Sequence, residues 1–171
     1  NVPIGSRRLL YLPYLMGERT PHLNPNCRGV FFGLSAIHTK ADMLRAVMEG
    51  VSYSLSDCLD ILREMQVAVS EMMACGGGGK SKIWRQMLAD MYGCEVKTIK
   101  AQEGPALGVA ILAGVGAGIF NDVQSACRQF IAQETYCQPE PASKAYYEKG
   151  HALYKKLYVQ LKDCYEELAQ L

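Results

Sequence analysis

Four consecutive glycines followed by a lysine and a serine, residues 76–81, form the segment of this sequence with the most evident chemistry. A short apolar run, residues 67–74, precedes the segment, and an amphipathic pattern begins near Ile83. In the order strand, loop and helix, backbone N–H groups at the helix start lack partners and face the positive end of the helix dipole. Glycine lets a phosphate or ribose approach those amides with no Cβ in the way. The pattern therefore predicts a nucleotide-binding loop made of Gly76, Gly77, Gly78, Gly79, Lys80 and Ser81.

Two other interpretations of this loop remain open. Gly79, Lys80 and Ser81 fit a relaxed phosphate-binding P-loop, but Ala74 stands where that motif requires its first glycine. A P-loop enzyme also needs an acidic residue at a second strand end to hold magnesium. Downstream, residues 96–100 and 111–120 contain no acidic residue. The remaining interpretation is a tight glycine turn without a ligand.

Two histidines and a glutamate offer a second kind of chemistry. Glu18, His22 and His38 would supply a general acid and base if the fold brought their side chains together. Loop histidines more often bond to backbone atoms, and the sequence favours that structural interpretation. Trp84 is interpreted in the same way, as a core side chain rather than a platform for an adenine ring.

The elements that must position the loop alternate between strand and helix, which indicates an α/β fold. Thr39 and Asp42 have the spacing of a capping box and open a helix that should run to about Glu64. Asn121 or Asp122 should cap a short later helix. The other predicted elements are strands at residues 8–14, 29–34, 67–74 and 95–100, and helices at 83–91 (ended by Gly93), at 104–118 and at the C-terminus.

Two helices carry further expectations about packing. The helix at 104–118 is rich in glycine, which costs about 1 kcal/mol per residue relative to alanine, so we expect close approach to a neighbouring helix or sheet. The terminal helix carries an apolar stripe at helical spacing, together with tyrosines that we expect to pack on their own domain. The stripe is Tyr146, Leu153, Leu157, Leu161, Cys164 and Leu168, and the tyrosines are Tyr147, Tyr154, Tyr158 and Tyr165.

Composition excludes several classes of function. The chain has 171 residues, 49% hydrophobic and 20% charged, which suits one folded domain and excludes a disordered chain. Lys and Arg number 18 against 17 Asp and Glu, and a net charge of +1 argues against nucleic-acid and anionic-membrane partners. The longest apolar stretch, residues 105–120, falls short of the ~20 residues that a membrane span needs.

Seven cysteines, widely spaced and odd in number, are predicted to be reduced, which favours the cytoplasm. Their spacing includes no Cys-x-x-Cys and no zinc-finger arrangement, so no metal site is predicted. The chain starts without methionine and without a signal-peptide pattern. We interpret it as a piece of a longer protein.

Four blocks of sequence in register along nearly the whole chain form a family pattern. The first block is Gly-Glu-Arg-Thr-Pro-His at residues 17–22, followed by Asn-Pro at 24–25. The second begins with Gly29, Phe31, Gly33 and Leu34 and closes with Asp42, Met43, Ala46, Val47, Met48 and Glu49. The third is the glycine loop with residues 84–86 and 89–90, and the fourth is Glu-Gly-Pro-Ala-Leu-Gly at residues 103–108. Together these blocks resemble the FGGY family of carbohydrate kinases.

The resemblance implies an α/β fold of the ribonuclease-H-like, actin-like ATPase type. Residues 1–171 would be part of its C-terminal, nucleotide-side domain, incomplete at the N-terminal strands. The parent enzyme would use ATP and Mg²⁺ to phosphorylate a pentulose sugar. Gly76, Gly77 and Gly78 then match the loop that wraps the nucleotide's α-phosphate and ribose. Ser81 matches a nucleotide-contacting position, Gly79 replaces a more usual alanine, and Lys80 either approaches a phosphate or is solvated.

The resemblance also implies what lies outside this sequence. In the family the sugar site belongs mostly to an N-terminal domain, absent here, and the catalytic aspartate precedes the first block. No residue of this chain is therefore assigned as a catalytic base, and the chain alone is expected to bind ATP weakly and to be inactive. A homodimer remains open. The alternative from another class is a non-catalytic interaction or regulatory domain that keeps the fold.

Overall fold

The structure, a computed structural model, describes residues 2–99 and 104–171. Contacts along the chain define two units. The first unit comprises the chain up to Val69, residues 90–93 and residues 139–171, whereas the second comprises residues 70–89 and 94–138. The second unit is thus inserted into the sequence of the first. The predicted strand residue Lys100 and the motif residue Glu103 lie outside the described residues.

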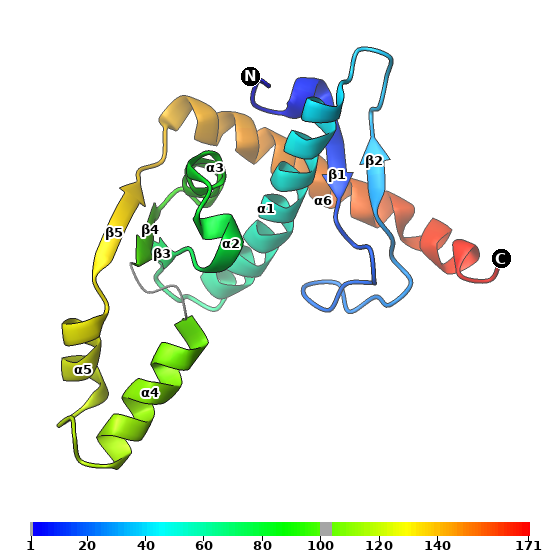
Figure 1. Ribbon diagram of the computed structural model, residues 1–171. Coiled ribbons are helices and arrows are strands. Elements are labelled where there is room, and N and C mark those ends of the chain that lie inside the picture. The colour runs from blue at the N-terminus through cyan, green and yellow to red at the C-terminus, as the bar shows by residue number, and fades with distance from the viewer. Residues whose placement is uncertain (1, 100–103) are drawn as a thin grey trace. The chain divides into compact units, whose positions relative to one another are not determined.

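The first unit combines a two-stranded sheet with two long helices (Figure 1). Its elements are the 3₁₀ helix η1 (Ser6–Arg8), β1 (Leu10–Leu12), β2 (Val30–Phe32), α1 (Lys40–Glu64) and α6 (Pro141–Leu168). β1 and β2 run antiparallel and place Tyr11 opposite Phe31. The structure confirms both predicted strands, each with three residues. Pro13 follows the first strand, where a residue without an N–H cannot continue the ladder.

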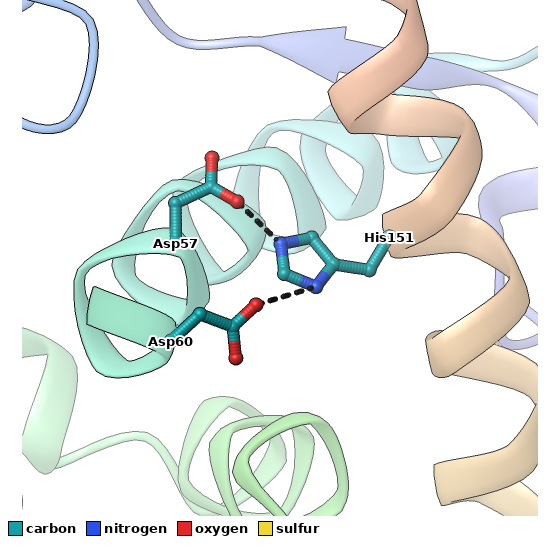
Figure 2. Close-up of side chains that lie close together, drawn as sticks. All are labelled: Asp57, Asp60 and His151. Atoms are coloured by element: carbon teal, nitrogen blue, oxygen red, sulfur yellow. Dashed lines mark hydrogen bonds and ion pairs between the residues drawn. The ribbon is translucent and has the colours of Figure 1, made fainter. Parts of the chain in front are cut away.

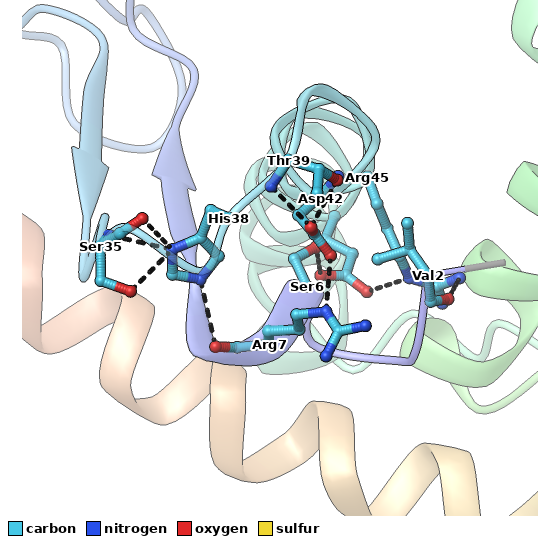
Figure 3. Close-up of polar contacts among 9 residues, drawn as sticks. Val2, Ser6, Arg7, Ser35, His38, Thr39, Asp42 and Arg45 are labelled. Carbon is cyan, nitrogen blue, oxygen red and sulfur yellow. Dashed lines mark hydrogen bonds and ion pairs between the residues drawn. The ribbon is translucent and has the colours of Figure 1, made fainter.

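A capping box opens α1, as the sequence predicts (Figure 3). The Asp42 amide donates to Thr39 Oγ1 at 3.4 Å, and the Asp42 carboxylate accepts from the Thr39 amide at 2.8 Å. Arg7 Nε lies 3.2 Å from Asp42 Oδ1, which ties η1 to the start of α1. The bonds from Thr39, with a smaller effect of the Arg7 charge, hold the pKa of Asp42 below its ordinary value. The predicted end of α1 at Glu64 is also confirmed.

Glu49 on α1 is a buried carboxylate that joins three segments of the first unit. Its Oε1 accepts from the Gly5 amide and from Arg45 Nε, each at 2.9 Å, and its Oε2 accepts from Ser6 Oγ at 2.8 Å. From α6, the Tyr147 hydroxyl donates to Oε1 at 3.2 Å. A buried charge is costly unless it is paired and hydrogen-bonded, and these four donors meet that condition. Glu49 therefore holds the start of the chain, α1 and α6 together.

Helix α1 approaches strand β1 so closely that a side chain does not fit at one position. A Cβ on Gly50 would overlap the carbonyl oxygen of Tyr11. Beside this contact, Leu9 and Ala46 are fully buried. Met43 packs against the same cluster. The core of this part of the first unit thus lies between one face of α1 and the β1 segment.

The buried face of α6 is aromatic. Four of the five tyrosines of the helix, Tyr147, Tyr154, Tyr158 and Tyr165, are at most 7% exposed, which confirms that they pack on their own chain. The predicted apolar stripe is wrong in part: Leu157 is buried, but Tyr146, Leu153 and Leu168 are 45%, 44% and 52% exposed. Aromatic partners determine which face of α6 is buried, because the rings of Tyr14 and Tyr53 pack against Tyr154.

The second unit is built on a three-stranded sheet in the order β3-β4-β5. Its strands are β3 (Glu71–Met73), β4 (Glu95–Ile99) and β5 (Gln133–Cys137), and its helices are α2 (Gly76–Gly79), α3 (Lys82–Tyr92), α4 (Gly104–Gly116) and α5 (Val123–Phe130). β3 and β4 run parallel, and β5 adds an antiparallel edge that the sequence analysis does not predict. Residues 90–92 of α3 belong to the first unit. Asp122 caps α5 by accepting from the Ser125 amide, which decides between the two predicted caps.

Only part of helix α4 approaches a neighbour closely, although its glycines lead us to expect close packing along the helix. A Cβ on Gly114 would overlap the Phe120 ring, but a Cβ on Gly108 or Gly116 would meet nothing within 4 Å among the described residues. Two apolar side chains of the helix, Val109 and Leu112, are 67% and 61% exposed. None of the helices in the described ranges is long and apolar enough to cross a membrane.

Candidate functional site: the glycine segment

The glycine segment follows β3 and leads into α3, within the second unit. The Ala74 amide extends the pairing of β3 by donating to the Lys97 carbonyl at 2.8 Å. The four glycines then form one helical turn, α2, instead of the open loop that the sequence suggests. The amides of Lys80 and Ser81 close this turn by donating to the carbonyls of Gly77 and Gly78 at 3.2 and 3.1 Å. These two amides are therefore already engaged within the chain.

The amides at the start of the turn differ from those at its end. No acceptor within the described ranges bonds the N–H groups of Gly76, Gly77 or Gly78. Gly76 has φ +71°, a left-handed conformation that favours glycine, and Gly76 and Gly77 are exposed. Unpaired donors at the start of a helical turn suit an anion or the hydroxyls of a sugar.

The four glycines differ in whether the structure around them could accept a side chain. A Cβ on Gly79 would lie 2.7 Å from the carbonyl oxygen of Ala74, and one on Gly78 would lie 3.2 Å from the Trp84 ring. At position 76 the positive φ favours glycine over other residues. At Gly77 neither reason holds: φ is not positive, and a Cβ would meet no described atom within 4 Å. The space beside Gly77 is therefore open to a ligand.

The polar side chains of the segment lie at its end. The Ser81 hydroxyl accepts from the Trp84 amide at 3.3 Å and so caps α3, while its own proton stays available to a ligand oxygen. Lys80 is exposed, and within the described residues it takes part in no ion pair. Trp84 is half-buried, and its ring lies beside Gly78. The predicted residues 76–81 thus form one helical turn and its exit, in which Gly79 is buried and Gly76, Gly77 and Lys80 are exposed.

The structure does not assemble the acid–base cluster considered for Glu18, His22 and His38. His22 Nε2 lies 3.2 Å from the Tyr14 hydroxyl. His38 Nε2 instead lies 3.2 Å from the Arg7 carbonyl, as Figure 3 shows. The carboxylate of Glu18 accepts from the backbone amides of the two residues that follow it, at 2.8 and 3.1 Å. Each of the three side chains therefore has a separate, structural set of partners.

A cluster that the sequence analysis misses lies in the first unit, between α1 and α6 (Figure 2). His151 Nε2 is 2.7 Å from Asp57 Oδ1, and His151 Nδ1 is 3.9 Å from Asp60 Oδ2. Burial raises the pKa of Asp60, but Lys155, His151 and Arg63 offset that effect, and the pKa lies below its ordinary value. The pairs Asp57 with Asp60 and His151 with Lys155 have helical spacings of three and four, a signal that could have indicated one face on each helix.

Geometry assigns this cluster a structural role. In the described part of the chain, Asp57, Asp60 and His151 are the one group of three close side chains that could hold a metal ion. The ammonium of Lys155 already lies between the carboxylates, 2.5 Å from Asp60 Oδ2 and 4.0 Å from Asp57 Oδ1. A second positive group, Arg63, is 3.2 Å from Asp60. Protein cations therefore pair with both carboxylates, although Asp57 Oδ2 is buried with no hydrogen-bond partner among the described residues, and the cluster joins α1 to α6.

Comparison with known proteins places these features in a family. Residues 2–117 match the C-terminal domain of the FGGY family of carbohydrate kinases. A xylulose kinase of Staphylococcus epidermidis is 41% identical over 165 residues, which cover 96% of this chain and 33% of that protein. The structure of a ligand-bound xylulose kinase from Lactobacillus acidophilus superimposes with a TM-score of 0.89 at 34% identity, over 98% of this chain and 34% of that one. A gluconate kinase from the same organism gives a TM-score of 0.88 at 34% identity, with the same coverage.

The mixed α/β fold is that of a C-terminal domain of the actin-like ATPase class. The chain belongs to the FGGY family of carbohydrate kinases. It spans about a third of the length of the relatives that it matches. The matched range includes the glycine segment, so the P-loop interpretation is not supported.

Proposed function

We propose that the parent protein transfers the γ-phosphoryl group of ATP to the 5-hydroxyl of D-xylulose, giving D-xylulose 5-phosphate. Family membership supports the kinase activity, and the xylulose kinases among the relatives favour D-xylulose as the acceptor. On this proposal residues 1–171 belong to the nucleotide-side domain, and the chain supplies the adenosine side of the cleft. A sugar-side domain and the catalytic base lie outside it.

The observation that carries the nucleotide assignment is the open position at Gly77. Within the described residues, neither backbone conformation nor a neighbouring atom excludes a side chain there. A ligand that approaches the backbone would exclude it. The amides of Gly76, Gly77 and Gly78 would then donate to oxygens of the nucleotide's α-phosphate and ribose, and the Ser81 hydroxyl would add a further donor. Gly79 is the buried end of the turn and packs against Ala74. Lys80 follows it and is exposed.

The bound ATP supplies the phosphoryl group, and Mg²⁺ neutralises charge on its phosphates. Magnesium is usually held by one or two carboxylates together with substrate phosphates. In the described residues the single candidate ligand set is the Asp57 cluster, where Lys155 already forms an ion pair with Asp60. We therefore assign no residue of this chain to Mg²⁺, and in this proposal the ion enters with ATP. The chain's own contribution is to bind and orient the nucleotide.

Replacing Gly77 with valine in the full-length protein tests the assignment. The branched side chain should block the nucleotide, raising the KM for ATP by about tenfold or more, with less effect on the KM for the sugar. Gly116→Val is a matched control, because Gly116 is also free of close neighbours among the described residues. Steady-state kinetics with each substrate varied in turn would measure both constants. A change confined to the KM for the sugar would contradict the loop assignment.

Gluconate is a second candidate acceptor, because the gluconate kinase structure matches this chain almost as well as the xylulose kinase structure does. Measuring kcat/KM for both compounds with the full-length protein would decide between them. We also propose a cytoplasmic location. The seven cysteines, all within the described residues, are free, as a reducing compartment would keep them.

A further inference from the structure

The end of the glycine segment is tied to α3 by an arginine. Arg85 Nη1 donates to the carbonyl oxygen of Gly79 at 2.6 Å. Arg85 stands one turn into α3, where its own amide donates to the Ser81 carbonyl at 2.9 Å. The Trp84 ring lies beside Gly78 of the same turn, so that a Cβ on Gly78 would be 3.2 Å from it. Two adjacent side chains of α3 therefore support α2.

The bond from Arg85 gives the last carbonyl of this turn a partner. The last carbonyls of a helix have no partners within it, and a helix of one turn has few others. The carbonyls of Gly77 and Gly78 accept from Lys80 and Ser81, and that of Gly79 accepts from Arg85. A charged donor makes a stronger bond than a neutral one. The arginine thus restrains the end of the turn more firmly than another backbone amide would.

The backbone of Ala74 also restrains Gly79. Gly79 is buried, with no room for a Cβ against the Ala74 carbonyl. Gly79 is therefore held between β3 and the guanidinium of Arg85. Arg85 Nε is itself buried with no hydrogen-bond partner among the described residues, so the bond from Nη1 to the Gly79 carbonyl is the contact that fixes the guanidinium to the turn.

We propose that Arg85 is a positioning residue for the nucleotide. It fixes the Gly79 carbonyl and so keeps the amides of Gly76, Gly77 and Gly78 turned toward the open space beside them. Arg85 acts through the backbone of the turn and touches no reacting atom. This inference rests on the proposed function, because it assumes that the turn binds the nucleotide.

The test uses the full-length kinase and four variants. Arg85→Met keeps the length of the side chain but removes its donors, and Arg85→Lys restores one charged donor. Arg128→Met makes the same chemical change at an exposed position of α5. Gly77→Val tests the turn itself. The measurements are the KM for ATP, the KM for the sugar, kcat at saturating ATP, and the Kd of the non-hydrolysable analogue AMP-PNP by calorimetry.

We expect Arg85→Met to raise the KM for ATP and the Kd of AMP-PNP by about tenfold, with kcat and the sugar KM within about twofold. Arg85→Lys should recover to within about threefold of the unmodified protein, and Arg128→Met should change nothing. A merely structural role would move the sugar KM and kcat together with the nucleotide constants, and that outcome would overturn the proposal. If Arg85→Met does not fold, Arg85→Gln, with a neutral donor, should give an intermediate loss of AMP-PNP affinity, and an unchanged Kd would overturn it.

The Gly77→Val variant separates the two ideas. If it weakens AMP-PNP binding while Arg85→Met leaves the Kd within twofold, the turn binds the nucleotide but Arg85 does not position it. If neither variant changes the Kd, the proposed function of the turn fails, and the role of Arg85 fails with it.

Discussion

At the scale of single residues, His22 shows how neighbours select a protonation state. Its ring stacks on Tyr158, with centroids 3.3 Å apart. The Tyr154 hydroxyl donates to the Tyr14 hydroxyl at 2.8 Å, so the single proton of Tyr14 is free to point at His22 Nε2, 3.2 Å away. That nitrogen must then carry a lone pair, which requires the neutral ring. Burial lowers the pKa of His22, although Asp57 and Glu18 act in the opposite direction.

A dependence of stability on pH follows. The ordinary pKa of histidine is 6.5, and the folded value is lower. Below pH 6.5 the unfolded chain therefore binds more protons at this site, and the stability from neutral His22 falls as the pH falls toward the folded pKa. His22→Gln cannot titrate, so its deficit in Tm relative to the unmodified protein should shrink between pH 7 and pH 5. Thermal unfolding at several pH values would measure the deficit, and a constant or growing one would contradict the prediction.

The sequence predicts which residues form the glycine segment but not why each glycine is there. Four glycines in a row after an apolar run are a local signal. The contact of Gly79 with Ala74 and that of Gly78 with Trp84 depend on how the turn closes, which no spacing reveals. The pair Asp57 and His151 lies 94 residues apart along the chain, so only the packing of two helices brings it together.

At the scale of elements, the contact between α1 and β1 fixes how far apart the helix and the strand can lie. A Cβ on Gly50 would meet the carbonyl of Tyr11, and a backbone atom cannot rotate away as the end of a side chain can. The glycine at 150 on α6 makes a softer contact, because the atom in the way is the Tyr53 hydroxyl. Both helices of the first unit thus contain a glycine at a close approach, with different tolerance.

Gly50→Ala should destabilise the protein by about 1–3 kcal/mol, despite the higher helix propensity of alanine, because the strand must move away. Urea unfolding followed by circular dichroism would measure the loss. Gly150→Ala should also destabilise, but adding Tyr53→Phe should recover part of the loss by removing the hydroxyl. A Gly50→Ala variant as stable as the unmodified protein would contradict the contact.

Elements with strong local signals were predictable, and those decided by distant partners were not. The capping box at Thr39 and the end of α3 before Gly93 follow from residue types a few positions apart. β5 carries little signal of its own, since Gln133–Cys137 is short and partly polar, and its pairing with β4 makes it a strand. On α6 two faces show helical spacing, and aromatic partners elsewhere in the first unit select the buried one.

At the scale of the whole molecule, the chain covers about a third of the proteins that it resembles. If the proposed function holds, that third binds the nucleotide but lacks most of the sugar site and the base. A positioned base contributes about 10²–10⁴ in rate, and its absence together with that of the sugar site should abolish turnover.

The purified 171-residue chain should therefore show no phosphorylation of D-xylulose above background, while retaining weak binding of ATP. A coupled assay for ADP release, with the full-length protein as positive control, measures the first, and calorimetry measures the second. Xylulose phosphorylation by the chain alone would contradict the division of roles between this chain and the rest of the parent protein.

The insertion of the second unit into the first also constrains how the protein is made. Glu49 and its partner Tyr147 are separated by 98 positions in the chain. A ribosome delivers β1, β2 and α1 early, and α6 emerges only after all of the inserted unit has been translated. Until then the Glu49 carboxylate lacks one of its four donors, and the faces that will meet the tyrosines of α6 stay uncovered. Completion of the first unit is thus a late event in synthesis, and a nascent chain that stalls before Pro141 should be a substrate for chaperones.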